Sequence, residues 1–104
     1  MLKGRKPTKK EQERLDLLGQ MPCIVCSKQG YNSPGEIHHL DGKTKPDAHM
    51  KTISLCWRHH REGSDCEAYT SRHPWKARFV QRYGTEESLL EETNIRIERL
   101  KETL

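Results

Sequence analysis

Three cysteines and one histidine form two pairs with the same short spacing, and this pattern constrains the fold more than any other feature. Cys23 and Cys26 are separated by two residues, and Cys56 and His59 repeat that spacing further along the chain. Such spacing lets a tight turn, or one turn of helix, aim both side chains at one point. Structural zinc sites use four sulfur or nitrogen ligands in a tetrahedron. The pattern therefore predicts a structural Zn²⁺ site, with His60 as the alternative fourth ligand.

The composition also favours a structural metal. Only 32% of the 104 residues are hydrophobic, whereas 33% are charged. A small domain buries a smaller share of its surface than a large one, and small scaffolds usually compensate with a metal or with disulfides. Cys66 is left over, and we expect it to be a half-buried free thiol.

The cysteines are more consistent with metal binding than with disulfides. The basic N-terminus is not followed by the apolar segment of a secretory signal. No apolar run approaches the roughly 20 residues that span a bilayer. We therefore expect no membrane association and a cytoplasmic location in a bacterial or virus-infected cell. In that reducing compartment, spaced cysteines are usually metal ligands.

The net charge of +4 is unevenly distributed along the chain. Residues 1–10 contain five basic residues and no acidic one, whereas residues 85–104 contain six Glu and three basic residues. A basic arm suits contacts with phosphate groups, although it can also be merely solubilising. We expect residues 1–7 to form a flexible basic arm and residues 8–104 to form a single domain.

Local signals predict a small α+β domain. Thr8 and Glu11 have the form of a capping box that begins a helix. Two short strand candidates joined by a polar turn predict a hairpin. Pro74 is expected at the first position of a later helix, and Thr85 begins the last one. The expected helices cover about 8–18, 56–62, 74–83 and 85–104, and the strands cover 36–40 and 52–55.

Several histidines are not needed by the zinc site. His38 and His39 end the first predicted strand, and His59 and His60 lie in the helix that follows the second. A lone histidine is usually a surface residue or a hydrogen-bonded core residue. Two histidine pairs, on a strand and a helix that the predicted zinc site holds together, are harder to explain as surface or core residues. They indicate a second, open metal site beside the first.

A hairpin followed by a metal-bearing helix resembles the HNH, or ββα-metal, nuclease superfamily. The chain is most similar to the phage Ref nucleases, which are recombination enhancement proteins whose cleavage depends on RecA filaments. The similarity covers roughly residues 5–92. The segments that carry it are Cys23-Ile-Val-Cys26, residues 37–46 (beginning Ile-His-His-Leu-Asp-Gly), Ile53-Ser-Leu-Cys56, Cys56-Trp-Arg-His59-His60, His73-Pro74 and Arg82-Tyr-Gly-Thr-Glu86.

The resemblance implies a treble-clef-like ββα finger flanked by N- and C-terminal helices, and it assigns roles to histidines. His38 becomes a ligand of the catalytic metal and His39 the general base. His60 and His73 become the second and third ligands. HNH sites often carry an Asn on the turn before the second strand. This chain has none there. His49 is the nearest candidate to orient that loop, although an exposed loop residue without a role is the favoured interpretation.

These residue types suit phosphodiester hydrolysis. One divalent cation (Mg²⁺, Mn²⁺, Zn²⁺ or Ni²⁺) would stabilise the leaving 3′-oxygen, and an all-histidine ligand set favours the transition metals. A neutral His39 can take a proton from the attacking water near pH 7, because the unperturbed imidazole pKa is about 6.5. Asp41 is an accessory candidate, as a ligand or as a hydrogen-bond partner of one.

Basic and aromatic residues surround the proposed site in the sequence. Contacts with phosphate groups hold DNA without reading its bases. Trp57 and Trp75 flank the histidines, and we expect them to cover the core, with base stacking as the alternative. The candidate DNA contacts are Lys43, Lys45, Arg61, Arg72 and Lys76.

The leading interpretation is a monomeric, metal-dependent HNH endonuclease of the Ref type. Its expected partners are DNA and a RecA-type recombinase filament. The alternative is a non-catalytic zinc-knuckle module that binds DNA or a recombination partner. A thiol redox protein built on Cys23 and Cys26 is disfavoured, because no thioredoxin-like βαβ pattern surrounds them.

Overall fold

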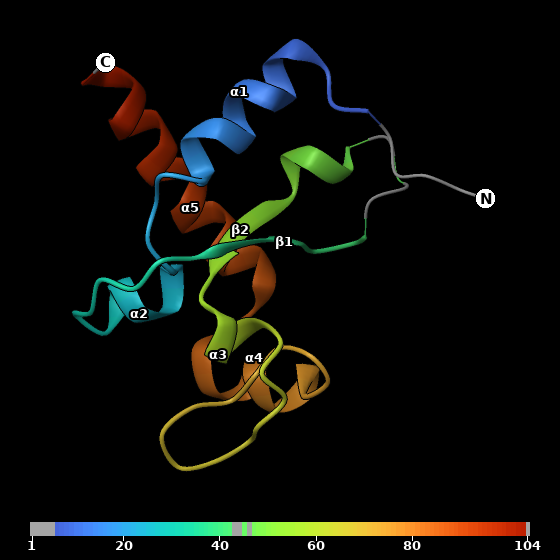
Figure 1. Ribbon diagram of the computed structural model, residues 1–104, viewed down its shortest axis with the longest axis vertical. Coiled ribbons are helices and arrows are strands. Elements are labelled where there is room, and N and C mark those ends of the chain that lie inside the picture. The colour runs from blue at the N-terminus through green and yellow to red at the C-terminus, as the bar shows by residue number, and fades with distance from the viewer. Residues whose placement is uncertain (1–5, 43–44, 46, 104) are drawn as a thin grey trace.

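The computed structural model describes residues 6–42, 45 and 47–103. Most of the predicted basic arm, and Lys43, lie outside these ranges. The described elements form the small α+β arrangement that the sequence predicts (Figure 1). In chain order they are α1 (Lys9–Leu18), α2 (Ile24–Lys28), β1 (Glu36–His39), the 3-10 helix η1 (Ala48–Met50), β2 (Thr52–Leu55), α3 (Trp57–His60), α4 (Lys76–Tyr83) and α5 (Glu86–Glu102).

The two strands form an antiparallel hairpin at the centre of the molecule. Glu36 lies opposite Leu55 at one end of the ladder, and His39 lies opposite Thr52 at the other. All four residues of β2 are buried. Helix α5 passes behind the hairpin and packs against β2, α1 and α2, while α3 packs against both strands (Figure 1). The hairpin therefore brings His38 next to His60 of α3, whereas His39 meets His49 of η1.

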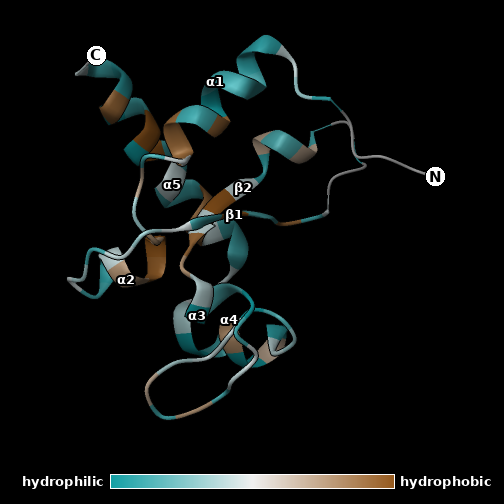
Figure 2. Ribbon diagram, in the orientation of Figure 1, coloured by the Kyte–Doolittle hydropathy of each residue, from teal (hydrophilic) through white to brown (hydrophobic). Residues whose placement is uncertain are grey.

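The apolar core consists of two small clusters, and the larger one is built around cysteine. Figure 2 shows apolar residues on α2, on β2 and along one side of α5. The smaller cluster joins α1 to α5 through Leu17, Leu18 and Ile97. The larger one contains Cys23, Ile24, Val25, Cys26, Ile53, Leu55, Cys56, Phe79 and Leu89. Three of the predicted zinc ligands are thus part of the main core.

The predicted helix starts are confirmed at both ends of the chain. The Thr8 backbone N–H donates to Glu11 Oε1 over 2.8 Å, and the Glu11 N–H donates to Thr8 Oγ1 over 3.2 Å. These reciprocal bonds satisfy backbone donors that a helix N-terminus otherwise leaves unpaired. Thr85 caps α5 with its side chain alone, accepting from the Ser88 N–H over 3.1 Å.

Helix α4 begins later than predicted. Pro74 was expected at its first position, but Trp75 is the N-cap and the helix starts at Lys76. The preceding segment is held by a different element. The Arg72 N–H donates to the His59 carbonyl over 2.8 Å, and the His73 N–H donates to the His60 carbonyl over 2.9 Å. Residues 72 and 73 are therefore hydrogen-bonded to the end of α3, and α4 begins only after this segment.

Other predictions of local structure also need correction. Trp57 and Trp75 do not cover the core, because 53% and 43% of their surfaces are exposed. Cys66 is exposed rather than half-buried. Cys23 is the N-cap of helix α2 and Cys26 lies within it, so the first pair uses a turn of helix rather than a tight turn. Among the described residues, no helix is long and apolar enough to cross a bilayer.

Candidate metal centres

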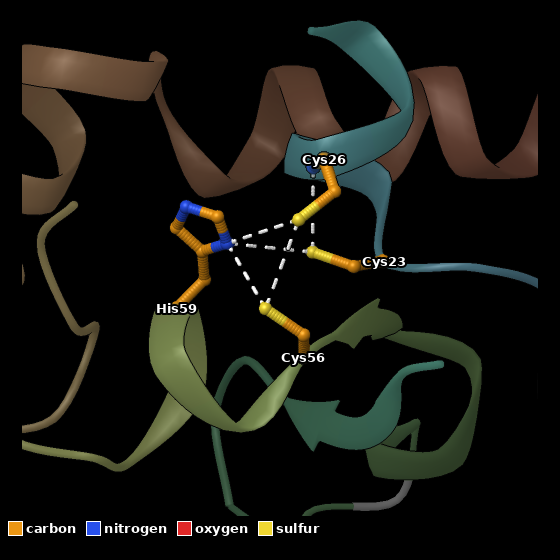
Figure 3. A group of neighbouring side chains, drawn as sticks. All are labelled: Cys23, Cys26, Cys56 and His59. Carbon is orange, nitrogen blue, oxygen red and sulfur yellow. Dashed lines mark hydrogen bonds between the residues drawn. The ribbon is translucent and has the colours of Figure 1, made fainter. Parts of the chain in front are cut away.

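Helices α2 and α3 bring the four predicted zinc ligands to one point (Figure 3). The Nδ1 atom of His59 lies 3.1 Å from the sulfur of Cys56, 3.5 Å from that of Cys26 and 3.7 Å from that of Cys23. The Cys26 and Cys56 sulfurs are 3.8 Å apart. Tetrahedral zinc, with bonds of about 2.3 Å to sulfur and about 2.1 Å to nitrogen, would separate two sulfurs by about 3.8 Å and sulfur from nitrogen by about 3.6 Å. The spacings fit such an ion.

The electrostatics of the cysteine group also suit a cation. All four side chains are buried. Burial raises the pKa of the Cys23 thiol to about 12, and it raises that of Cys26 as well. Three neighbouring thiolates in a buried site repel one another unless a positive ion compensates them. This closed group can bind a metal ion such as zinc.

A second group contains three histidines from different parts of the chain. His38 comes from β1, His60 from α3, and His73 from the segment that precedes α4; one potential ligand atom of each lies within 4.8 Å of the others. The ring centroids are 5.0 Å apart for His38 and His60, and 5.3 Å apart for each of the other two pairs. The structure thus brings together the three histidines that were proposed as ligands of a second metal.

The histidine group is open to solvent on one side. His38 is buried, His60 is intermediate and His73 is exposed. All three line a cavity of about 380 Å³, together with His39 and Arg72. Burial lowers the pKa of His60 and of His73. These two rings are therefore neutral near pH 7, which is the form in which imidazole binds metals.

Two carboxylates that sequence reasoning missed stand behind the histidine group. Glu86 Oε2 lies 2.9 Å from His38 Nε2, and Glu86 Oε1 accepts from the Arg72 guanidinium over 2.6 Å. Glu36 Oε1 lies 3.0 Å from His60 Nδ1. Carboxylates in this position orient metal-binding imidazoles and fix their tautomers. Each pairing leaves the other ring nitrogen of its histidine free of that carboxylate.

Both carboxylates are held as anions. Hydrogen bonds from Arg61 lower the pKa of Glu36 to about 2, against a smaller opposing effect of burial, and His60 adds to the lowering. Burial acts to raise the pKa of Glu86, but hydrogen bonds from His38 and Arg72 outweigh it and lower the pKa overall. Glu36 and Glu86 are therefore negatively charged near neutral pH and favour positive charge in the histidine group.

The signals for these carboxylates in the sequence differ. Glu36 precedes His38 by two positions in the strand, and alternate residues of a strand share a face. That periodicity could have identified it. Glu86 lies 48 residues from His38, and its local sequence indicates only the first turn of a helix. The packing of α5 against β2 brings it to the site.

The predicted base contacts a second histidine. His39 Nε2 lies 3.1 Å from His49 Nδ1, and the two rings meet edge to face. His49 belongs to η1 and is 7% exposed, so the favoured interpretation as an exposed loop residue is wrong. Among the described residues, neither ligand group includes Asp41, which instead lies 3.5 Å from Lys51.

The candidate DNA contacts fall into two classes. Lys45 and Lys76 are exposed. Arg61 is also exposed but forms a bidentate pair with Glu36. Arg72 is largely buried, with 12% of its side chain exposed, because it holds Glu86. Both arginines therefore hold carboxylates of the histidine group, and the two lysines and Arg61 present their charges to solvent.

The comparison with known protein families matches most of the chain. A family model described as "Recombination enhancement, RecA-dependent nuclease" covers residues 7–98. This span includes the hairpin, both ligand groups, and the two carboxylates behind the histidines. The chain belongs to the family of recombination-enhancement, RecA-dependent nucleases.

Proposed function

We propose that this chain is a metal-dependent DNA endonuclease of the HNH class. One observation carries the proposal: three histidines converge at an open cavity, two of them are backed by carboxylates, and His39 lines the same cavity. Membership of a nuclease family supports it. The order hairpin and then α3 supports the ββα-metal, treble-clef-like assignment.

The proposed catalytic metal site consists of His38, His60 and His73. The donor set fits a divalent ion, because neutral imidazoles suit zinc, nickel, cobalt or manganese and Glu36 and Glu86 supply compensating charge. When bound there, such an ion would provide positive charge for the scissile phosphate and for the leaving 3′-oxygen. The cysteine group is closed and fully buried, which supports a structural role for its metal.

His39 is the proposed general base. Its Nε2 lies 3.1 Å from Nδ1 of His49, and this contact supports a fixed orientation of the His39 ring. A neutral imidazole at this position would take a proton from the attacking water. His39 is adjacent to His38 in the strand, and both line the cavity. This neighbourhood supports a division of labour in which one histidine holds the cation and the next moves a proton.

DNA and a RecA-type filament are the proposed partners. The family description names RecA dependence, and Lys45 and Lys76 offer exposed positive charge to phosphate groups. Lys43 remains a proposed contact that lies outside the described residues. We propose that the filament presents the DNA strand to the cavity of the histidine group.

A nicking assay tests the proposed activity. The protein is incubated with supercoiled and with single-stranded DNA, in Mg²⁺, Mn²⁺, Zn²⁺, Co²⁺ or Ni²⁺, with and without a RecA filament. We expect cleavage with at least one metal and stimulation by the filament. Binding to DNA without cleavage under every condition would contradict the proposal and favour the non-catalytic zinc-knuckle alternative.

Glu86→Gln is expected to weaken metal binding by the histidine group by about 10- to 100-fold, because the carboxylate orients His38. Titration with Co²⁺ after the cysteine group has been filled with zinc measures this affinity through the visible absorption of the ion. Glu87→Gln changes the adjacent exposed residue and should bind Co²⁺ like the wild type. Equal weakening in both variants would show that Glu86 has no special role.

A further inference from the structure

A buried arginine connects the first helix to the strand that faces His39. Arg14 lies in α1 and is 6% exposed. Its guanidinium donates to Thr52 Oγ1 over 3.1 Å, to the Thr52 carbonyl over 2.8 Å and to Asn94 Oδ1 over 2.7 Å. These acceptors belong to β2 and α5. Burying a charged group is costly unless its hydrogen bonds are satisfied, so this arrangement places Thr52 firmly.

Thr52 in turn contacts the histidine pair. Its hydroxyl donates to the His49 carbonyl over 3.1 Å. His49 meets the His39 ring through its Nδ1, and His39 is the residue paired with Thr52 across the hairpin. A continuous set of hydrogen bonds therefore runs from Arg14 through Thr52 and His49 to His39. Thr52 approaches His39 in two ways, through the strand pairing and through His49.

We propose that Thr52, held by Arg14, is a positioning residue for the general base. This inference rests on the proposed function, because it assumes that His39 accepts the proton. The Thr52 hydroxyl accepts from Arg14 and donates to His49, so both of its hydrogen-bonding roles are used. Removing it frees the η1 backbone at His49 and lets the His49 ring, and with it the His39 ring, change orientation. A misplacement of about 1 Å can cost about 100-fold in rate.

The chain offers a close set of variants for the test. Thr52→Val keeps the shape but removes the hydroxyl, and Thr52→Ser restores it. Thr93→Val is the matched control, because Thr93 is equally buried and its hydroxyl donates to the Leu89 carbonyl within α5, away from His39. We expect Thr52→Val to lower kcat for DNA cleavage by about 10- to 100-fold with little change in KM. Thr52→Ser should recover most of the loss, and Thr93→Val should cleave like the wild type.

A spectroscopic measurement separates positioning from general damage. Long-range ¹H–¹⁵N spectra of the zinc-loaded protein report the ring nitrogens of His39 and His49. In Thr52→Val these two sets of signals should shift, and in Thr93→Val they should match the wild type. Unchanged ring signals and unchanged kcat in Thr52→Val would overturn the proposal. Equal losses of kcat in the two valine variants would also overturn it, because the effect would then be one of stability.

The failure of this inference and that of the proposed function are distinguishable. If His39→Ala abolishes cleavage while Thr52→Val leaves kcat unchanged, the enzyme assignment stands and the positioning role is wrong. If His39→Ala cleaves DNA normally, His39 is not the base and the positioning role falls with it. In that case the ring signals of Thr52→Val would still show whether Thr52 orients the rings of His49 and His39.

Discussion

Replacing Cys23 with serine is expected to unfold the protein. Cys23 is fully buried, and its sulfur belongs both to the ligand group and to the larger apolar cluster. Structural zinc contributes about 10–16 kcal/mol of apparent binding free energy in small zinc domains, which exceeds the stability of most small domains. Loss of one ligand should therefore remove the helical circular dichroism signal and the cooperative thermal transition.

Cys66→Ser is the matched control for this experiment. Cys66 is an exposed free cysteine that belongs to neither ligand group. Its replacement should leave the thermal transition and the zinc content unchanged. Prolonged treatment of the wild type with a strong chelator should reproduce the effect of Cys23→Ser. A Cys23→Ser protein that melts like the wild type would contradict a structural metal at this site.

His39→Ala is expected to lower the rate of DNA cleavage by about 10²- to 10⁴-fold, the usual contribution of a general base. The side chain is only partly buried and lies outside both ligand groups. Folding, zinc content and DNA affinity should therefore be retained. The measurement is single-turnover cleavage of DNA at saturating metal, with binding followed by fluorescence anisotropy.

His60→Ala distinguishes a base from a metal ligand. This variant removes one of the three converging imidazoles, so it should lose Co²⁺ from the histidine group as well as activity. His39→Ala should keep that Co²⁺ and lose activity alone. If both variants lose the metal equally, His39 is a ligand and the assignment of the base is wrong. If both lose their circular dichroism signal, the separation of structural and catalytic groups fails.

Much of the local structure was predictable because its causes are local. The capping box of Thr8 and Glu11 contains both partners of each hydrogen bond within one helical turn. The hairpin followed from two short strand candidates joined by a polar turn. The start of α4 was predicted incorrectly, because it depends on backbone bonds from Arg72 and His73 to a separate helix. Local sequence does not contain those partners.

The spacing of residues by itself indicated the ligand pairs of the closed group, and the structure chose His59 over His60 as its fourth member. Two intervening residues place both members of each pair on one turn. The side chains of Cys23 and Cys26, and those of Cys56 and His59, therefore point to the same side whatever the rest of the fold is. The likeness of the paired histidines to HNH nucleases also indicated which imidazoles meet. Both features depend on short separations in the chain or on a motif that can be read directly from it.

Only the tertiary structure decided what stands behind those histidines. Glu86 reaches His38 because α5 packs against β2, and Arg14 reaches Thr52 while α1 packs against α5 and η1. These partners are separated by 48 and 38 residues. The sequence around Glu86 or Arg14 does not indicate which distant group its side chain will contact. Its partner is selected when the apolar faces of the helices pack, and that long-range choice sets the orientation of the site.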